Sequence, residues 1–302
     1  MTQAIHVEVG GRQLKLSNLD KVFYPAGGFT KAQVIDYYTR VAPALVHHMA
    51  GRPLTLKRYP DGVDGPFFYE KKCPSHRPEW FRTASVWSGR NKENINYCVV
   101  DDLPGLVWVA NMASIELHTS LALAEDVHKP TMVVFDLDPG APATIKECCD
   151  VGLQLRDLFA ELKLKSFAKT SGSKGLQVYV PLNTAITYEE TKPLALAVAQ
   201  ELERKNPRLV LSSMSKELRK GKVFVDWSQN DDHKTTVCVY SLRARERPTV
   251  SAPVSWDEVE AHHKGGRKAL SFTADEVLER LDRTGDLFAQ VLKLKQRLPH
   301  FG

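Results

Sequence analysis

Residues 131–140, TMVVFDLDPG, form an apolar run that ends in two carboxylates, Asp136 and Asp138, one residue apart. On an extended strand, side chains at positions i and i+2 point to the same face. The two carboxylates would then project together, with their Cα atoms roughly 7 Å apart. Each is costly beside a buried strand, and the two repel each other. A divalent cation removes both penalties, so the stretch predicts a magnesium or manganese site.

Composition indicates a globular chain with a mild preference for polyanionic partners. The 302 residues, 43% apolar and 25% charged, can bury a sizeable core, and the net charge of +5 favours acidic partners only weakly. Five cysteines without a Cys-x-x-Cys pair argue against a disulfide framework or a zinc site and fit a reducing cytosol. The N-terminus is no signal peptide, and no apolar run reaches membrane-spanning length. We expect a soluble, cytoplasmic protein that contacts no membrane.

Helical and strand patterns are interleaved without strict βαβ order, which predicts an α+β fold with a mostly antiparallel sheet. Helices are expected at residues 30–50, 143–164 and 188–205, after Thr273, and again at 286–298, with Pro43 bending or dividing the first. Strands are expected at 176–182, 222–227 and 237–242. The stretch 251–266 either precedes a C-terminal helical appendage or is a surface loop.

Three more segments could carry chemistry. In TSGSKG, residues 170–175, the glycines let backbone amides converge on a phosphate, and Ser171 and Lys174 add a hydroxyl and a charge. The spacing is not that of a P-loop, so a plain hairpin turn is an equal alternative. In KVFVDWSQN, residues 222–230, Asp226 interrupts an apolar run as a capped or paired carboxylate or as a third metal ligand. Basic residues on both sides of Asp226 form a solvated face or contact phosphates: Lys216, Arg219, Lys220, Lys222, Arg243, Arg245 and Arg247.

Three aspartates, a glycine-serine-lysine turn and arginines together favour phosphoryl transfer by positioning and charge neutralisation. In such chemistry one cation lowers the pKa of an attacking hydroxyl, and the other holds the leaving pyrophosphate. The pattern supports nucleotidyl transfer better than acyl transfer or redox chemistry.

In this order, the motifs resemble the polymerase domain of bacterial ATP-dependent DNA ligase D, within the archaeo-eukaryotic primase superfamily. The segments that carry the resemblance span nearly the whole chain: LSNLDKVFYP, TKAQVIDYY, GRPLTLKRYPDGVDGPFFYEK, VVFDLDPG, TSGSKGLQVYVPL, LRKGKVFVDWSQN and YSLRARERPTVSAP. The resemblance implies a single primase-polymerase catalytic domain over residues 1–302. Its parts are an N-terminal α/β part (1–130), an RRM-like antiparallel catalytic sheet (131–250) and a C-terminal helical appendage (251–302).

The resemblance implies a DNA-dependent nucleotidyltransferase that adds nucleotides, preferably ribonucleotides, to 3′ ends at DNA breaks or short gaps. The reaction would use two Mn²⁺ or Mg²⁺ ions and NTP or dNTP substrates. The setting would be non-homologous end joining or related gap-filling repair, with primer synthesis less favoured. The implied partners are 5′-phosphorylated DNA, Ku and an ATP-dependent DNA ligase, in the cytoplasm at the nucleoid.

The resemblance also implies roles for individual residues. It assigns Asp136, Asp138 and Asp226 to the two metal ions. Around the incoming nucleotide it places Lys57, His118, Ser171, Lys174, Arg219, Gln229 and Arg243. On DNA it places Asn18, Lys21 and Lys31 at the 5′-phosphate beyond a gap, and Phe68 and Tyr69 stacked near the template base. Without the resemblance, the first three would be a helix-start cap and solvated lysines, and the aromatic pair would belong to the core.

The chain departs from the family pattern at Gln177, where the family usually has histidine. Glutamine donates and accepts but carries no charge, so we expect weaker triphosphate or metal stabilisation with activity retained. Two rival functions stay open: a non-catalytic DNA-end-binding module, and a haloacid-dehalogenase-type phosphatase, which needs Thr or Val where Gly140 stands. No ligase or nuclease segment follows Gly302, so we expect a stand-alone polymerase or an excised domain.

Overall fold

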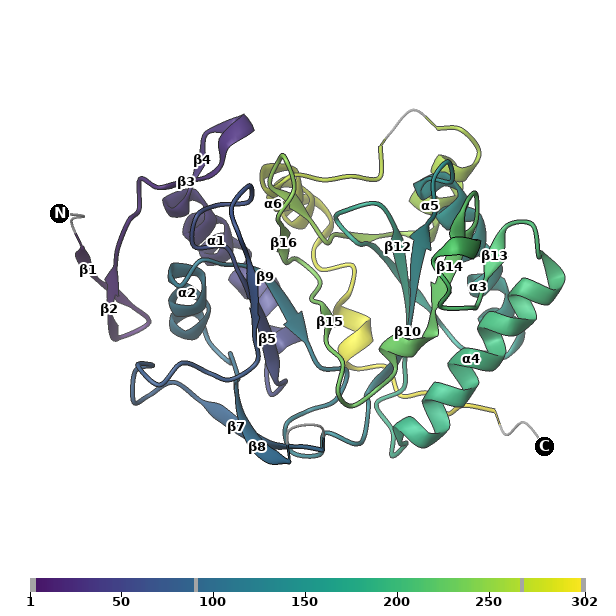
Figure 1. Ribbon diagram of the computed structural model, residues 1–302, viewed down its shortest axis with the longest axis horizontal. Helices are drawn as coiled ribbons and strands as arrows, with labels where there is room; N and C mark the ends of the chain where they lie inside the picture. The colour runs from purple at the N-terminus through teal and green to yellow at the C-terminus, as the bar shows by residue number, and fades with distance from the viewer. Residues whose placement is uncertain (1–3, 90–91, 267–268, 300–302) are drawn as a thin grey trace. The chain divides into compact units, whose positions relative to one another are not determined.

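The computed structural model describes residues 4–89, 92–266 and 269–299. The chain forms two compact units, each built from separate stretches of sequence (Figure 1). The first unit comprises Met1–Ser120, Thr235–Val250 and Thr273–Gly285, and the second comprises Leu121–Lys234, Ser251–Phe272 and Asp286–Gly302. This grouping follows contacts between residues, and the predicted division at residues 130 and 250 stays a prediction.

The second unit is built on a six-stranded sheet in the order β13-β14-β10-β12-β11-β18, in which only the β13–β14 pair is parallel. The strands are β13 (Val210–Leu211), β14 (Val223–Asp226), β10 (Met132–Pro139), β12 (Leu176–Pro181), β11 (Phe167–Thr170) and β18 (Pro253–Val254). The helices are α3 (Ile145–Glu161), α4 (Tyr188–Lys205) and α5 (Trp256–His263), and the short 3₁₀ helices are η2 (Glu217–Arg219), η3 (Trp227–Gln229) and η4 (Ala289–Leu292). The expected α+β class with a mostly antiparallel sheet is confirmed.

Helices α3 and α4 lie along this sheet, and α5 packs against α3 (Figure 1). The apolar residues of β10 explain the arrangement, because Phe135 packs on Phe159 of α3 with ring centroids 5.5 Å apart. Thr144 begins α3 through a capping box with Glu147, so the local sequence sets where the helix starts. The residues of β10 that alternate with Phe135 therefore point to the opposite face of the sheet, away from α3.

The first unit contains a second six-stranded sheet, with the path β15-β9-β5-β8-β7 and β6 paired to β5. Its strands are β15 (Thr236–Val237), β9 (Ser114–Thr119), β5 (Leu54–Arg58), β8 (Glu93–Cys98), β7 (Thr83–Ser88) and β6 (Phe68–Glu70). Three small antiparallel pairs are β1 (Ile5–Val9) with β2 (Arg12–Leu16), β3 (Val22–Tyr24) with β4 (Phe29–Thr30), and β16 (Leu242–Arg243) with β17 (Thr249–Val250). The helices are α1 (Lys31–Met49), α2 (Leu103–Asn111) and α6 (Ala274–Thr284), together with η1 (Pro25–Gly27).

Helix α1 begins as predicted, with Thr30 as the N-cap of a capping box that Gln33 completes. Pro43 lies inside α1 without dividing it. Tyr37 and Tyr38 are buried on this helix, and their hydroxyls donate to backbone oxygens of Tyr240 at 2.8 Å and Ile115 at 2.6 Å. The helix is thus held to the unit by buried hydrogen bonds as well as by apolar packing.

Two predicted elements are wrong, and so is the surface-loop alternative for residues 251–266, because these residues contain β18 and α5. The expected strand at 237–242 is interrupted, because Tyr240 takes a left-handed conformation (φ +66°) and the amide of Ser241 donates to the oxygen of Cys238 in a turn. The expected helix at 286–298 is reduced to η4. Beyond η4 the chain is held by Gln296, whose amide group donates to the oxygens of Lys165 and Pro181, so the segment runs along the unit in a non-helical conformation.

The structure also pairs two cysteines that the sequence analysis left apart. Cys73 and Cys98 form a disulfide, and Cys148, Cys149 and Cys238 are buried free thiols. The argument against a disulfide framework therefore fails for Cys73 and Cys98. Because the two cysteines are 25 residues apart in the sequence, no local pattern indicates that they pair. The fold of the first unit brings them together. Among the described residues, no helix is long and apolar enough to cross a membrane.

Candidate active site

The predicted metal ligands meet on one face of the second unit's sheet. Asp136 lies directly opposite Asp226 in the antiparallel register of β10 and β14, and opposite Gln177 on β12. Asp138 follows two residues after Asp136 and so projects from the same face. That face is the one opposite Phe135, which packs on α3. The structure thus brings Asp226 next to two carboxylates from which it is distant in the sequence.

The carboxylate of Asp136 is only partly satisfied by hydrogen bonds. Its Oδ1 is buried without a hydrogen-bond partner, whereas Gln177 donates a hydrogen bond to the carboxylate. Burial and the neighbouring charges of Asp138 and Asp226 raise its pKa to about 7. A buried carboxylate oxygen beside two more carboxylates is the donor set that a hard divalent cation binds. The residues present therefore fit a bound Mn²⁺ or Mg²⁺.

Asp226 is held by the residues that follow it. Its Oδ1 accepts hydrogen bonds from the amide of Ser228 at 2.9 Å and from the Ser228 hydroxyl at 2.5 Å. Its Oδ2 accepts from Nε2 of Gln229 at 2.7 Å. Lys234 in turn donates to the Ser228 hydroxyl. Gln229, which the resemblance places at the nucleotide, is here engaged with Asp226.

A second cluster of acidic residues has its potential ligand atoms closer together than those of the predicted triad. Within the described residues, three ligating side chains with donor atoms all within 4.8 Å of one another are found at Asp231, Asp232 and His233, and not at the predicted triad. Asp231 is paired with Lys192 at 2.5 Å, and Asp232 lies 2.9 Å from Nδ1 of His128. Because these groups already neutralise one another near the surface, the cluster is a weaker metal candidate than the buried oxygen of Asp136.

The glycine-serine-lysine turn joins β11 to β12 next to the carboxyl end of β10. The Ser171 hydroxyl accepts hydrogen bonds from the amides of Ser173 at 3.2 Å and Gly175 at 3.0 Å. A Cβ atom at Gly175 would lie 2.1 Å from the backbone oxygen of Leu137, so only glycine lets the turn pass this close to β10. Lys174 is exposed at the tip. The segment is a hairpin turn, as one of the two interpretations expected, and it also leaves Lys174 accessible to a phosphate.

Arg219 lies on the carboxylate face. Its guanidinium stacks 3.9 Å above the ring of Phe224, which lies opposite Asp138 and two residues before Asp226. Its Nε is buried without a hydrogen-bond partner. The backbone of Arg219 passes close to Gly140. A Cβ atom at Gly140 would lie 1.9 Å from the backbone oxygen of Arg219, so glycine is needed at this position. A guanidinium fixed beside carboxylates with an unused donor suits a phosphate ligand.

The remaining nucleotide-binding candidates gather in the first unit around Glu116, a residue that the sequence analysis missed. Glu116 is 2% exposed on β9, and its carboxylate lies 3.1 Å from Nε2 of His118, 3.3 Å from Nε of Arg243 and 3.5 Å from Nζ of Lys57. The hydroxyl of Tyr59 also donates to it, at 3.3 Å. The available signal was Ser114, Glu116 and His118 at alternate positions of an apolar run, the same pattern as Asp136 and Asp138.

Electrostatics in this cluster favour a charged Glu116. Burial by itself raises the pKa of Glu116, but the hydrogen bond from His118 and the charges of Arg243 and Lys57 outweigh it, and the pKa falls well below its usual range. Burial lowers the pKa of His118 and of Lys57, against the pull of Glu116. The carboxylate therefore holds three basic side chains in one place.

The aromatic pair is exposed rather than in the core. Phe68 and Tyr69 on β6 are 44% and 58% exposed, which excludes the core alternative for both. The ring of Tyr69 makes an edge contact with the His118 ring, with centroids 6.1 Å apart, and Arg58 lies 5.2 Å above the ring of Phe68. Exposed rings beside basic side chains are suited to stack on nucleobases.

The three residues predicted at a 5′-phosphate also come together. Lys31 donates its amide to the backbone oxygen of Lys21 at 2.8 Å, and Lys21 donates its amide to that of Asn18 at 3.1 Å. Lys21 pairs with Asp61 at 2.7 Å. Lys31 is only 4% exposed and donates to the oxygen of Ser17, so the solvated-lysine alternative is wrong for it. Burial and the charges of Lys21 and Arg58 lower the pKa of Lys31 to about 8.

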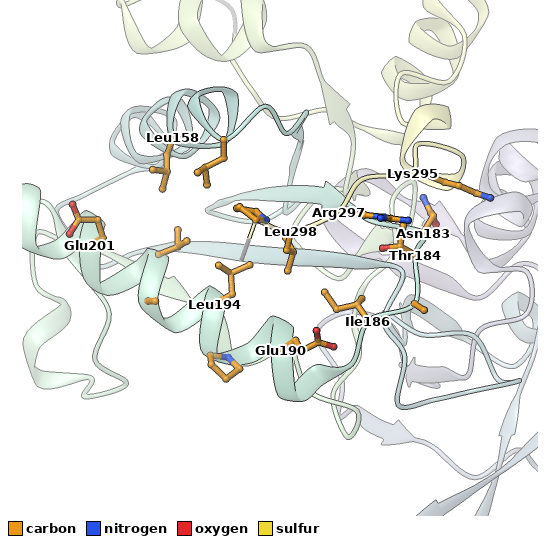
Figure 2. A pocket seen from close by; sticks show the side chains of 16 residues that line it. Leu158, Asn183, Thr184, Ile186, Glu190, Leu194, Glu201, Lys295, Arg297 and Leu298 are labelled. Atoms are coloured by element: carbon orange, nitrogen blue, oxygen red, sulfur yellow. The ribbon is translucent and has the colours of Figure 1, made fainter. Parts of the chain in front are cut away.

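A separate pocket in the second unit holds none of the predicted site residues (Figure 2). Leu158 of α3, Leu194 of α4 and Leu298 of the C-terminal segment form its apolar lining, and Lys295 and Arg297 lie at its margin. Its walls are thus α3, α4, the loop of residues 183–186 before α4, and the C-terminal segment. The predicted carboxylates lie on the sheet face opposite α3, so this pocket is no part of the candidate active site.

Comparisons with known proteins agree on one family. The family model described as LigD, primase-polymerase domain, matches residues 30–288. The chain is 45% identical over 282 residues to the multifunctional non-homologous end joining protein LigD of Mycolicibacterium smegmatis, covering 92% of this chain and 36% of that protein. It is 29% identical to the bifunctional LigD of Bacillus subtilis, covering 95% of this chain and 45% of that protein. The chain thus spans about a third to a half of the length of these relatives.

A solved structure matches over the same extent. The polymerase domain from Mycobacterium tuberculosis Ligase D, in complex with DNA, superposes with a TM-score of 0.86 at 40% identity. The match covers 94% of this chain and 99% of that one.

Proposed function

Since the chain belongs to the family of LigD primase-polymerase domains, which are DNA-dependent nucleotidyltransferases, we propose that Asp136, Asp138 and Asp226 hold two divalent cations that serve this reaction. The observation that carries the proposal is the buried, unpartnered Oδ1 of Asp136, directly across the sheet from Asp226. Family membership also sets aside the phosphatase alternative.

The reaction joins the 3′ oxygen of a DNA end to the α-phosphorus of a nucleoside triphosphate and releases pyrophosphate. Bound Mn²⁺ or Mg²⁺ would lower the pKa of the 3′ hydroxyl and neutralise charge on the phosphates. Arg219 and the exposed Lys174 would bind phosphate oxygens, with Ser171 shaping the turn that carries Lys174. Gln229 would keep Asp226 in place through its hydrogen bond.

The Glu116 cluster would bind nucleotide through Lys57, Arg243 and His118. Glu116 keeps these basic groups from repelling one another, so a triphosphate would meet a preorganised cationic surface. Phe68 and Tyr69 would stack on a base, since both rings are exposed.

DNA is the proposed partner, because the similar mycobacterial polymerase domain was solved as a complex with DNA. Asn18, Lys21 and Lys31 would contact a 5′-phosphate, since backbone hydrogen bonds hold Lys31, the first residue of α1, next to Lys21 and hold Lys21 next to Asn18. The names of the LigD relatives support a role in non-homologous end joining, which brings Ku and an ATP-dependent DNA ligase as proposed partners. Short gaps in other repair reactions would present the same substrate.

The test is extension of a gapped, 5′-phosphorylated duplex with NTPs and Mn²⁺. The wild type should extend the 3′ end, and Asp136→Ala should lose extension while keeping its affinity for the duplex. Asp157→Asn is the matched control, because this carboxylate is 63% exposed on α3. Binding without extension by the wild type would instead support a non-catalytic end-binding module. Extension by Asp136→Ala at the wild-type rate would exclude the proposed centre.

A further inference from the structure

A buried lysine continues the row of residues that crosses the sheet at Asp136. Lys169 on β11 lies opposite Gln177 on β12, and Gln177 lies opposite Asp136 on β10. Lys169 and Gln177 are 0% and 2% exposed. The ammonium of Lys169 donates to Oε1 of Gln177 and, at 2.6 Å, to the hydroxyl of Ser251. Gln177 in turn donates to the carboxylate of Asp136.

The chemistry of these groups gives the row a direction. An ammonium group has three donors and no acceptor, so the Gln177 atom that it contacts must be the amide oxygen. The hydroxyl of Tyr179 also approaches this oxygen, at 3.4 Å. The amide nitrogen of Gln177 then points the other way and offers its hydrogens to Asp136. A glutamine amide without such a partner could adopt either orientation, since its two ends have nearly the same shape.

We propose that Lys169 is a positioning residue that acts through Gln177 to hold the carboxylate of Asp136, leaving Oδ1 available to a divalent cation. The inference rests on the proposed function, because it takes Asp136 as a metal ligand. Groups that orient a metal ligand in this way typically contribute about 10- to 100-fold to metal affinity. The amide also places a neutral group between the ammonium and the carboxylate, so the cation of Lys169 does not occupy the metal's position.

The same logic says which side chains can replace Gln177. An imidazole can accept from Lys169 at one ring nitrogen and donate to Asp136 from the other, so Gln177→His keeps the direction of the row. Leucine has nearly the volume of glutamine but neither donates nor accepts. Gln177→Leu therefore breaks the row with little change in packing volume.

The experiment measures Mn²⁺ binding to the 302-residue chain by electron paramagnetic resonance of the free ion, without nucleotide or DNA. Lys169→Met and Gln177→Leu should each weaken binding by roughly 10-fold or more. The double variant should bind no more weakly than Gln177→Leu alone, because Lys169 acts through the amide. Gln177→His should stay within about threefold of the wild type if the hydrogen-bonded direction of the row is what matters.

Ser251→Ala is the matched control, since it removes a second hydrogen-bond acceptor of Lys169 and spares the amide. It should leave Mn²⁺ affinity within about threefold of the wild type. Wild-type affinity in Lys169→Met, additive losses in the double variant, or an equal loss in Ser251→Ala would each overturn the inference. If circular dichroism shows Lys169→Met to be unfolded, equal affinities of Gln177→Leu and Gln177→His would overturn it.

Asp136→Ala separates this inference from the proposed function. If Asp136→Ala abolishes Mn²⁺ binding while Lys169→Met and Gln177→Leu leave it intact, the metal centre stands and the positioning role of Lys169 fails. If Mn²⁺ binding survives in Asp136→Ala, the proposed centre fails and the inference fails with it.

Discussion

Asp226 lies directly opposite Asp136 in the antiparallel pairing of β14 with β10. Residues in this relationship have Cβ atoms about 5 Å apart and share one face of the sheet. Two like charges so close are unfavourable without a compensating group, and Asp138 adds a third. Ser228 and Gln229 satisfy part of Asp226, whereas Oδ1 of Asp136 has no partner. A bound cation would remove the imbalance.

Asp226→Asn should reduce nucleotide addition at least about 100-fold, because it removes one negative charge from the three carboxylates that would hold the ions. Affinity for the gapped duplex, measured by fluorescence anisotropy, should stay near the wild-type value. Asp232→Asn is the control, since Asp232 belongs to the surface cluster with His233. A larger loss of activity in the control than in Asp226→Asn would contradict the proposed centre and favour the surface cluster as the metal site.

Glu116→Gln should destabilise the protein by roughly 3 kcal/mol, because removing one partner leaves buried basic groups uncompensated. Lys57 and Arg243 have side chains only 13% and 14% exposed, so solvent relieves little of this penalty. Urea denaturation followed by tryptophan fluorescence measures the change in the free energy of unfolding. The surface variant Asp157→Asn should change it by less than about 0.5 kcal/mol. Equal stability of Glu116→Gln and wild type contradicts the account of the cluster.

The same carboxylate predicts how stability depends on acid. The pKa of Glu116 is lowered in the folded chain. Below about pH 4.5 the unfolded chain therefore binds a proton at Glu116 that the folded chain does not bind. Its contribution to stability is present above this pH and is lost as the pH falls toward the folded pKa. The free energy of unfolding of the wild type should therefore fall more steeply between pH 5 and pH 3 than that of Glu116→Gln. Parallel curves would show that Glu116 titrates normally.

Gly175→Ala should cost about 1–3 kcal/mol of stability, because the added Cβ would lie 2.1 Å from the backbone oxygen of Leu137 and the turn must move away from β10. Nucleotide addition should fall as well, since Lys174 moves with the turn. Gly27→Ala is the matched control, because a Cβ there meets nothing within 4 Å. Thermal unfolding of both variants distinguishes a steric effect from a general cost of replacing glycine. A general cost would lower the unfolding temperatures of the two variants equally.

Tyr69→Ala should weaken binding of gapped DNA by roughly 5- to 100-fold, the range expected for the loss of one base-stacking ring. Its stability should change little, because the ring is 58% exposed. Ile5→Ala, at a side chain 41% exposed on β1, should leave DNA affinity unchanged. Anisotropy titrations of both variants at one salt concentration make the comparison. If Tyr69→Ala binds gapped DNA with wild-type affinity, the proposed stacking of this ring on DNA is wrong.

Local signals predicted a large part of this fold. Thr30, Thr144 and Thr273 each begin a helix through a capping box, and this depends only on residues three positions away. The i and i+2 spacing of Asp136 and Asp138 likewise places both on one face of any strand. The strand at 237–242 was wrong because Tyr240 turns the chain, and an apolar run does not reveal one left-handed residue.

Pairing between distant segments was beyond such signals. Nothing near residue 226 says that it will lie opposite Asp136, and nothing near Lys169 says that its ammonium will contact the amide of Gln177. The same holds for Glu116 and for the disulfide between Cys73 and Cys98. Strand register depends on the burial of whole sheet faces, which sums many weak contacts over the fold. The chain therefore carries its chemical groups and helix starts in local patterns, while their assembly into a site follows from long-range packing.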